Sequence, residues 1–268
     1  MGKKNYTRRK ADKHILYEEA VQNPEFDAKF VRRLYKSIRG RKPADLKEDF
    51  CGTFSFACEW VKLDSDHRAI GVDLHKPTIK WGVKNNMSKL KDGQKKRIEL
   101  KEANVLDVTK PQVDIVTAFN FSYFCFKTRE QMRDYYRAAY ESLRSDGLFI
   151  MDCFGGSQSY LEQEERRECD GFVYVWEHAS YSPVTSDLKC KIHFEFKDGT
   201  EWKNAFVYEW RMWNLVDLTE ILYDVGFKEV QIHWEGTDEK TGEGNGVFRK
   251  TKKGEACESW IAYIVGIK

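Results

Sequence analysis

The chain has 268 residues, of which 41% are hydrophobic and 14% aromatic, so it can build a sizeable core and general disorder is excluded. Its 45 lysines and arginines nearly cancel its 43 aspartates and glutamates, and the formal charge of +2 does not indicate a dedicated nucleic-acid binder. Seven scattered cysteines without CxxC spacing argue against a disulfide framework or a metal site. No apolar run reaches the ~18 residues of a membrane span. We therefore expect a cytoplasmic protein without bound metal.

The N-terminal region begins with a basic stretch, "MGKKNYTRRKADKH", which holds six lysines and arginines before His14. It is either a solvated, frayed terminus or an arm that contacts RNA or an acidic partner. Apolar residues at helical spacing between residues 14 and 39 then predict two helices. We expect them to be separated at "NPE", residues 23–25, and the second to be closed by Gly40.

Short apolar strands alternate with helices over the next hundred residues. The predicted strands are "DLKEDF" (45–50), "HRAIGVDL" (67–74), "KRIELKEANV" (96–105), "VDIVTAF" (113–119) and "DGLFIMDCF" (146–154). The predicted helices are 54–61, 76–90 and 128–143. This alternation predicts a parallel sheet with right-handed crossovers.

After Gly155 the apolar residues change to a period of two, which predicts antiparallel strands at 171–182, 187–199 and 200–213 with a hairpin turn at 197–200. A helix (215–227), a strand (228–234), a glycine-rich loop (235–246) and a last strand (258–267) follow. We expect an α/β fold with a seven-stranded, mostly parallel, doubly wound sheet whose last strand is reversed. N-terminal helices and an antiparallel insertion after strand five complete it.

The expected organisation has four parts. They are a basic arm with N-terminal helices (1–42), a cofactor-binding core (43–156), a substrate-covering insertion (157–210) and the end of the core (211–268).

Ligands of open α/β sheets bind beyond the carboxyl ends of the strands, where this chain carries "EDFCGT", "GVDLHKP", "EANVLDV" and "AFNFSYF". Asp73 lies a little over 20 residues past Gly52, the spacing at which a carboxylate holds ribose hydroxyls. It could instead cap the following helix. The first turn lacks G-x-G-x-x-G, so a pyrophosphate cradle is poorly supported. An adenosine ligand with a cationic amino-acid end suits the acids of this turn better.

Residues 45–152 resemble the class I S-adenosylmethionine-dependent methyltransferases. "EDFCGTFSF" is similar to the first motif of that family, D-x-x-C-G-T-G, while "IGVDL", "ANVLDV", "VDIVTAFNFSY" and "LRSDGLFIMD" resemble the later segments in order. Two positions depart from the pattern, since Phe54 replaces the last glycine of the first motif and Asn104 replaces the usual aspartate of the third. An asparagine carbonyl can still accept from adenine N6.

The resemblance implies S-adenosylmethionine as cofactor and assigns its contacts. The backbone at Phe50, Cys51 and Gly52, followed by Thr53, would approach the methionine part, with Glu48 or Asp49 near its ammonium. Asp73 would take the ribose hydroxyls beside Leu74. Asn104 and Val105 would hold the adenine edge, and Asn120 and Phe121 would border the sulfonium.

On the substrate side, we expect the insertion and the N-terminal helices to close over the cofactor and shape an acceptor pocket. Tyr17 and Gln22 are candidate polar contributors, and Trp176 is either a pocket wall for a cation or a core residue. Arg211 is either a clamp for a substrate carboxylate or an ordinary surface pair. If the acceptor carries a proton at attack, the candidate bases are His178, Tyr123 and Tyr208.

The predicted function is methyl transfer to a small-molecule acceptor by in-line displacement, with the methylated atom (N, O or S) undetermined. Alternatives are a methyltransferase that modifies RNA or protein through the basic N-terminus, a non-catalytic S-adenosylmethionine-binding module and a nicotinamide dehydrogenase. The sequence does not indicate the oligomeric state.

Overall fold

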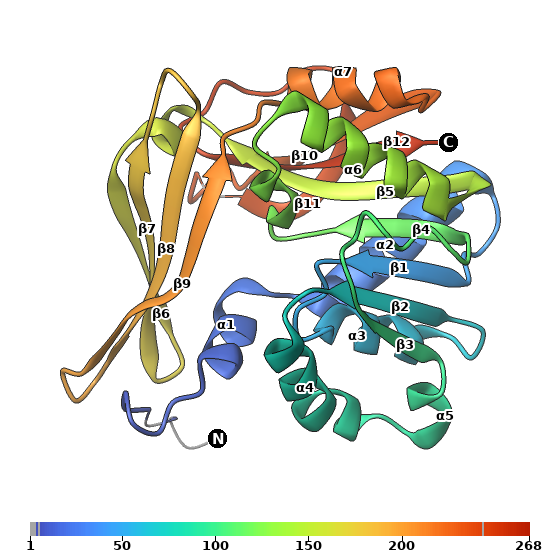
Figure 1. The fold of residues 1–268 in the computed structure, drawn as a ribbon. Helices are drawn as coiled ribbons and strands as arrows, with labels where there is room; N and C mark the ends of the chain where they lie inside the picture. Colours follow the sequence, from blue (N-terminus) through green and yellow to red (C-terminus); the bar gives the residue numbers. More distant parts are fainter. Residues whose placement is uncertain (1–3, 5, 243) are drawn as a thin grey trace.

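An eight-stranded sheet forms the centre of the protein (Figure 1). The computed structural model describes residues 4, 6–242 and 244–268. The strand order is β11-β10-β12-β5-β4-β1-β2-β3, and the five strands from β5 to β3 run parallel. Their bounds are β1 Asp45–Asp49, β2 Arg68–Asp73, β3 Ile98–Glu102, β4 Val113–Ala118 and β5 Leu143–Gly155. The strand order reverses beside β1, and this switch point is where such sheets bind ligands.

The far side of the sheet is antiparallel. β12 (Trp260–Ile267) lies between β5 and β10 (Glu229–Thr237) and runs against both, which confirms the reversed last strand. The edge strand β11 (Gly244–Thr251) was not predicted: its first three residues were assigned to the glycine-rich loop and the rest to no element, so the sheet has eight strands rather than seven. Its side chains are nearly all exposed, and it therefore lacks the alternating pattern that marks a half-buried strand.

Helices cover both faces of the sheet. Helices α6 (Arg129–Ser142) and α7 (Leu215–Val225) pack into a core cluster on one face. Helices α2 (Pro24–Arg39), α3 (Ser55–Leu63) and α4 (Lys76–Asn85) pack into the cluster on the other. Short helical turns are η1 (Met87–Lys89), α5 (Asp92–Lys95), η2 (Ser122–Cys125) and η3 (Ser157–Tyr160).

The N-terminal helices form as the capping residues predict. α1 (Lys13–Val21) begins after Asp12, whose side chain accepts from the amides of His14 and Ile15. α2 begins after Asn23 with Pro24 in its first turn and ends at Gly40, whose φ of 71° is left-handed. The predicted break between the two helices and the closing role of Gly40 are confirmed.

A second, four-stranded antiparallel sheet stands beside the central one, with α1 between the two (Figure 1). Its strands are β6 (Gln163–Cys169), β7 (Phe172–Tyr181), β8 (Asp187–Phe196) and β9 (Glu201–Arg211). β7, β8 and β9 match the three predicted strands, and the predicted turn at 197–200 joins β8 to β9. β6 was not predicted, because its sequence "QEERREC" is almost wholly polar and exposed. α1 packs Leu16 and Ala20 onto this sheet.

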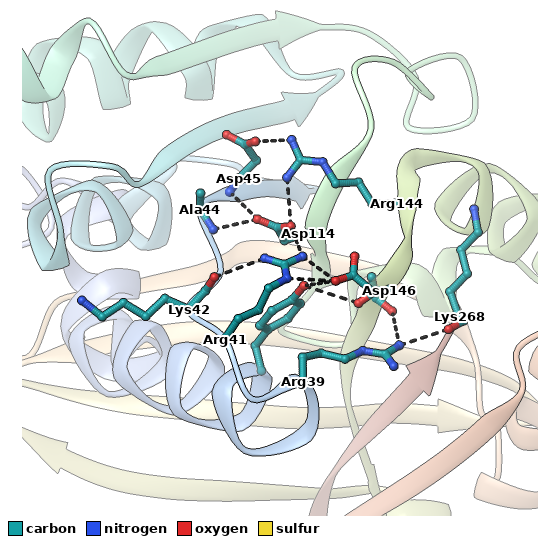
Figure 2. Close-up of polar contacts among 11 residues, drawn as sticks. Arg39, Arg41, Lys42, Ala44, Asp45, Asp114, Arg144, Asp146 and Lys268 are labelled. Atoms are coloured by element: carbon teal, nitrogen blue, oxygen red, sulfur yellow. Dashed lines mark hydrogen bonds and ion pairs between the residues drawn. The ribbon is translucent and has the colours of Figure 1, made fainter.

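A polar cluster ties the link between α2 and β1 to the amino ends of the strands, opposite the ligand edge (Figure 2). The fully buried carboxylate of Asp114 accepts from the guanidiniums of Arg41 (2.8 Å) and Arg144 (2.9 Å) and from the amides of Ala44 (2.7 Å) and Asp45 (3.0 Å). Burial opposes the charge, but these donors hold the pKa of Asp114 below its usual range. The cluster therefore fixes where β1 enters the sheet.

Candidate functional site

The turn between β1 and α3 is held against the end of β2. The Cys51 amide donates to the Val72 carbonyl (3.0 Å), and the Gly52 amide donates to a carboxylate oxygen of Asp73 (2.8 Å). Gly52 has a φ of 52° and Phe54 a φ of 46°. Phe54 thus adopts the left-handed conformation that the family's glycine would favour. Its buried ring lies so close to Gly82 that a Cβ there would come within 2.6 Å of it.

The two acids that precede this turn point in different directions. Asp49 is buried, pairs with Lys47 (3.0 Å) and accepts from the Tyr135 hydroxyl (3.2 Å). Glu48 accepts only from the Ala57 amide in the first turn of α3 (3.0 Å) and forms no ion pair within the described residues. Burial, reinforced by neighbouring carboxylates, raises the pKa of Glu48 well above its ordinary value. Glu48 is therefore the acid whose buried negative charge a ligand ammonium would neutralise.

Asp73 organises the neighbouring ends of β2 and β3. Besides Gly52, its carboxylate accepts from the His75 amide (2.7 Å), and its carbonyl accepts from the Ala103 amide (3.1 Å). The next residue, Asn104, accepts from the Leu106 amide through its side chain (3.1 Å). The Asp73 carboxylate thus joins the turn after β1 to the segment that leads into α4, and its contact with a ribose stays a prediction. Leu74 is exposed, and Val105 is buried.

Asn120 and Phe121 follow β4 with left-handed backbone conformations, each with a φ of 56°. Their amides donate to the two carboxylate oxygens of Asp152 near the end of β5, at 2.7 and 3.0 Å. Left-handed conformations are uncommon for such residues and need support from the surroundings. Asp152 supplies that support to the loop expected beside the sulfonium.

A cavity of about 490 Å³ opens beside this loop. That volume is within the range of small-molecule sites. α1, α2, the ends of β4 and β5, the antiparallel sheet and the β10–β12 strands all contribute to it. Its lining is Tyr17, Ala20, Val21, Asn23, Phe26, Asp27, Phe119, Asn120, Phe121, Asp152, Glu165, Arg167, Tyr174, Trp176, Ile192, Tyr208, Trp210, Glu235, Gly246, Phe248, Ile261 and Tyr263.

The cavity brings together five of the predicted residues, Tyr17, Asn120, Phe121, Trp176 and Tyr208. Burial raises the pKa of both the Tyr17 and the Tyr208 hydroxyl, so neither is prepared to act as a base near neutral pH. Trp176 packs against Tyr208, with ring centroids 6.0 Å apart.

Among the residues predicted for the acceptor side, Tyr123, His178 and Arg211 do not line the cavity. Tyr123 is fully buried on η2, and its hydroxyl donates to the Asp152 carbonyl (2.7 Å). His178 is buried against Trp176 (5.8 Å between ring centroids), and burial lowers its pKa. Arg211 stacks on Trp213 (3.9 Å) and donates to the Lys127 carbonyl (3.1 Å), and it does not line the cavity. Core packing therefore accounts for Tyr123 and His178, and contacts outside the cavity account for Arg211.

α1 connects the cofactor turn to the second sheet. Glu18 accepts from the Thr53 hydroxyl (2.5 Å) and from the Asn86 amide (2.7 Å), while Gln22 accepts from the Ser55 hydroxyl (2.8 Å). Gln22 thus holds the start of α3 rather than the cavity wall. Because these hydrogen bonds reach both the turn between β1 and α3 and the end of α4, the position of α1 is coupled to the shape of that turn.

Sequence reasoning missed the acids and part of the apolar wall of the cavity. Asp152 could have been found, because it is a polar residue near the end of an otherwise apolar strand, where α/β sheets place ligand contacts. Asp27 lies in an amphipathic helix, Glu235 lies in the end of β10 that was assigned to the loop, and Phe248 lies in β11, which was not predicted. These three have no distinctive local signal.

All seven cysteines are free thiols. Within residues 4, 6–242 and 244–268, no group of three or more metal-binding side chains could hold an ion. In that same part of the chain, no helix has the length and apolar character needed to cross a membrane. The basic N-terminal stretch lies partly outside the described residues; within them, Lys4 pairs with Glu19 and Arg8 stacks on Trp202 (3.6 Å).

No protein-family model and no curated protein matches the chain. Solved structures do match over nearly the full length. CcbJ methyltransferase from Streptomyces caelestis has a TM-score of 0.66 and 15% identity, covering 92% of this chain and 97% of that one. An S-adenosylmethionine-dependent methyltransferase from Clostridium acetobutylicum has a TM-score of 0.65 and 17% identity, covering 94% and 96%.

A third match is CalS10 from Micromonospora echinaspora, an amino pentose methyltransferase solved with S-adenosylmethionine bound (TM-score 0.65, 12% identity, covering 98% of this chain and 99% of that one). All three matches include both the central sheet and most of what surrounds it, since so little of either chain is left out. The chain therefore has the fold of the class I S-adenosylmethionine-dependent methyltransferases.

Proposed function

We propose that the protein is an S-adenosylmethionine-dependent methyltransferase that acts on a small-molecule acceptor. The observation that carries the proposal is the junction of two features at the carboxyl edge of the sheet. One is the turn between β1 and α3, in which Gly52 is bound to Asp73 and Glu48 has no cationic partner among the described residues. The other is the adjacent cavity of about 490 Å³, which the Asn120–Phe121 loop lines.

The residues present fit this cofactor. Glu48 would receive the ammonium of the methionine part, Asp73 the ribose hydroxyls, and Asn104 with Val105 the adenine edge. The Asn120–Phe121 loop would border the sulfonium. When bound, S-adenosylmethionine supplies an electrophilic methyl group, and the chain's own contribution is to orient the acceptor in line with it and to exclude water.

A small acceptor suits the cavity better than a macromolecule does. The cavity is walled by two sheets and two helices, and two of the described basic residues of the N-terminal stretch, Lys4 and Arg8, are engaged with Glu19 and Trp202. The structural neighbour CalS10 acts on an amino pentose, which supports the same reading. We also propose a cytoplasmic location, because the scattered cysteines suit a reducing compartment.

The test is a screen of metabolite extracts with methyl-labelled S-adenosylmethionine and the full chain. We expect label to enter a small, extractable product, with Asp73→Ala reducing the transfer. Label that enters only RNA or protein, and is lost on deletion of residues 1–13, would favour a macromolecular substrate. Tight cofactor binding without turnover on any extract would instead indicate a binding module.

A further inference from the structure

The residues that line the cavity carry a strongly negative formal charge, although the whole chain is slightly positive. Four carboxyl groups (Asp27, Asp152, Glu165 and Glu235) and a single guanidinium (Arg167) line it, a formal charge of −3, whereas the whole chain carries +2. The guanidinium of Arg167 already donates to the Ala20 carbonyl and stacks on the Tyr174 ring, 5.2 Å away. The cavity therefore attracts positively charged ligands.

None of the four carboxyl groups forms an ion pair within the described part of the chain. Asp27 accepts from the Tyr263 hydroxyl (2.9 Å), Glu235 accepts from the Gly246 amide (2.9 Å), and Asp152 accepts from two loop amides. Unpaired carboxylates in a half-buried place are costly to the fold. Burial accordingly raises the pKa of Asp27 to about 6 and that of Asp152 to about 7.

Aromatic rings make up most of the remaining wall. Trp176, Tyr208 and Trp210 pack together from β7 and β9, and Phe248 and Tyr263 pack together from β11 and β12 (4.6 Å between ring centroids). The faces of such rings attract cations, and the attraction grows when water is excluded. Unpaired carboxylates and aromatic faces select the same kind of ligand, an organic ammonium.

We propose that the methyl acceptor is an amine that binds as its ammonium cation, with Asp152 and Asp27 as its carboxylate partners and Asp152 as the group that accepts its proton. This inference rests on the proposed function and specifies its substrate class. Asp152 is the acid best placed for the proton, because its oxygens hold the Asn120–Phe121 loop that would border the sulfonium. Asp27, bonded to Tyr263, would hold and orient the ammonium.

The chemistry balances without a further reactant. The ammonium (R–NH₃⁺) gives one proton to the Asp152 carboxylate, which becomes a neutral carboxylic acid and leaves the amine with a free lone pair. That pair forms the new N–C bond to the methyl group of S-adenosylmethionine while the C–S bond breaks, its electrons remaining on sulfur. The products are S-adenosylhomocysteine and a methylated ammonium, and Asp152 then releases its proton to solvent. A carboxyl whose pKa is near 7 makes the first transfer less unfavourable than an ordinary aspartate would.

The inference can be tested by binding, independently of turnover. The probes are two matched pairs, tyramine with tyrosol and glucosamine with glucose, titrated against the full chain saturated with S-adenosylhomocysteine. Trp176 and Trp210 line the cavity, so their fluorescence should report occupancy. We expect at least one amine to bind tenfold or more tightly than its alcohol. Asp152→Asn and Asp27→Asn should each reduce that preference to below threefold.

Asp134→Asn serves as the matched control, because it removes one carboxylate from an exposed α6 residue that pairs with Arg137. It should leave the preference unchanged. The affinity for S-adenosylmethionine should change less than threefold in Asp27→Asn. Asp152→Asn can also relax the loop it supports, so the Asp27 variant keeps the inference testable if the Asp152 variant folds poorly.

Three results would overturn the inference: no preference for either amine, no binding of any probe, or a preference that survives in both variants. A large loss of cofactor affinity with the amine preference intact would show that the acids serve the cofactor, and it too would refute the proposal. If the wild-type chain does not bind S-adenosylmethionine at all, the proposed function fails. If it binds the cofactor but prefers no amine, only this inference fails.

Discussion

Replacing Asp73 with alanine should weaken S-adenosylmethionine binding by at least tenfold. In the structure the Asp73 carboxylate accepts from the Gly52 and His75 amides at 2.8 and 2.7 Å and faces the turn where the ribose is expected. Hydrogen bonds to charged groups contribute roughly 1.5–3 kcal/mol each. Losing even one such bond to a ribose hydroxyl is worth about tenfold, since 1.4 kcal/mol is a factor of ten. Calorimetric titration measures the change directly.

Asp73→Ala also removes the acceptor of the Gly52 amide. A weaker affinity alone would therefore not show whether the variant has lost a contact with the ribose or has disturbed the turn at Gly52. The 2′-deoxyribose analogue of S-adenosylhomocysteine separates the two cases. If Asp73 contacts the ribose, the wild type should lose affinity for the deoxy analogue, while Asp73→Ala should bind the two ligands almost equally. If Asp73 acts only through the loop, the alanine variant should lose the same factor for both ligands. That outcome, or an unchanged affinity for S-adenosylmethionine, would refute the assignment.

Three further predictions concern the stability and shape of the site. Asp114→Asn should lower the free energy of unfolding by about 3 kcal/mol, the low end for a broken buried ion pair because Arg41 reaches solvent; urea denaturation tests this, and a loss under 1 kcal/mol would contradict it. Because the pKa of Asp114 is below its ordinary value of 3.8, its contribution should be present above that pH and disappear as the pH falls through the lowered pKa. Gly82→Ala should cost roughly 1–3 kcal/mol and weaken cofactor binding, since the new Cβ would come within 2.5 Å of the Thr53 carbonyl oxygen; a variant as stable as the wild type would show that the cofactor turn tolerates the intrusion. Trp176→Leu should impair methyl transfer more than cofactor affinity, and equal losses in the two assays would place Trp176 outside the acceptor pocket.

The parallel core could be predicted from sequence because its local signals agree with one another. The strands are short apolar runs, and Asn23 and Gly40 mark the ends of α2. Asp73 ends a strand at the number of residues past Gly52 that is typical of a ribose-binding carboxylate. Each of these signals is local and does not depend on distant parts of the chain. The order of the motifs along the chain then indicated the fold.

The acceptor side could not be predicted in the same way. Asp27, Asp152 and Glu235 come from α2, β5 and β10, and only the tertiary structure brings them to one cavity. Strand alternation pointed equally to Trp176 and His178 as cavity residues, but the packing leaves the first at the cavity and buries the second. Periodicity identifies which residues share a face of a strand, whereas it cannot say which part of that face remains uncovered.

The most direct test of the central claim is a calorimetric titration of the full chain with S-adenosylmethionine, with NAD⁺ and ATP as comparison ligands. We predict one S-adenosylmethionine bound per chain, competition by S-adenosylhomocysteine, and no comparable binding of the two phosphate-bearing ligands, because the turn at Gly52 offers no pyrophosphate cradle. Binding of NAD⁺ or ATP in preference to S-adenosylmethionine, or no binding of S-adenosylmethionine up to about 1 mM, equivalent to about −4 kcal/mol, would contradict the account.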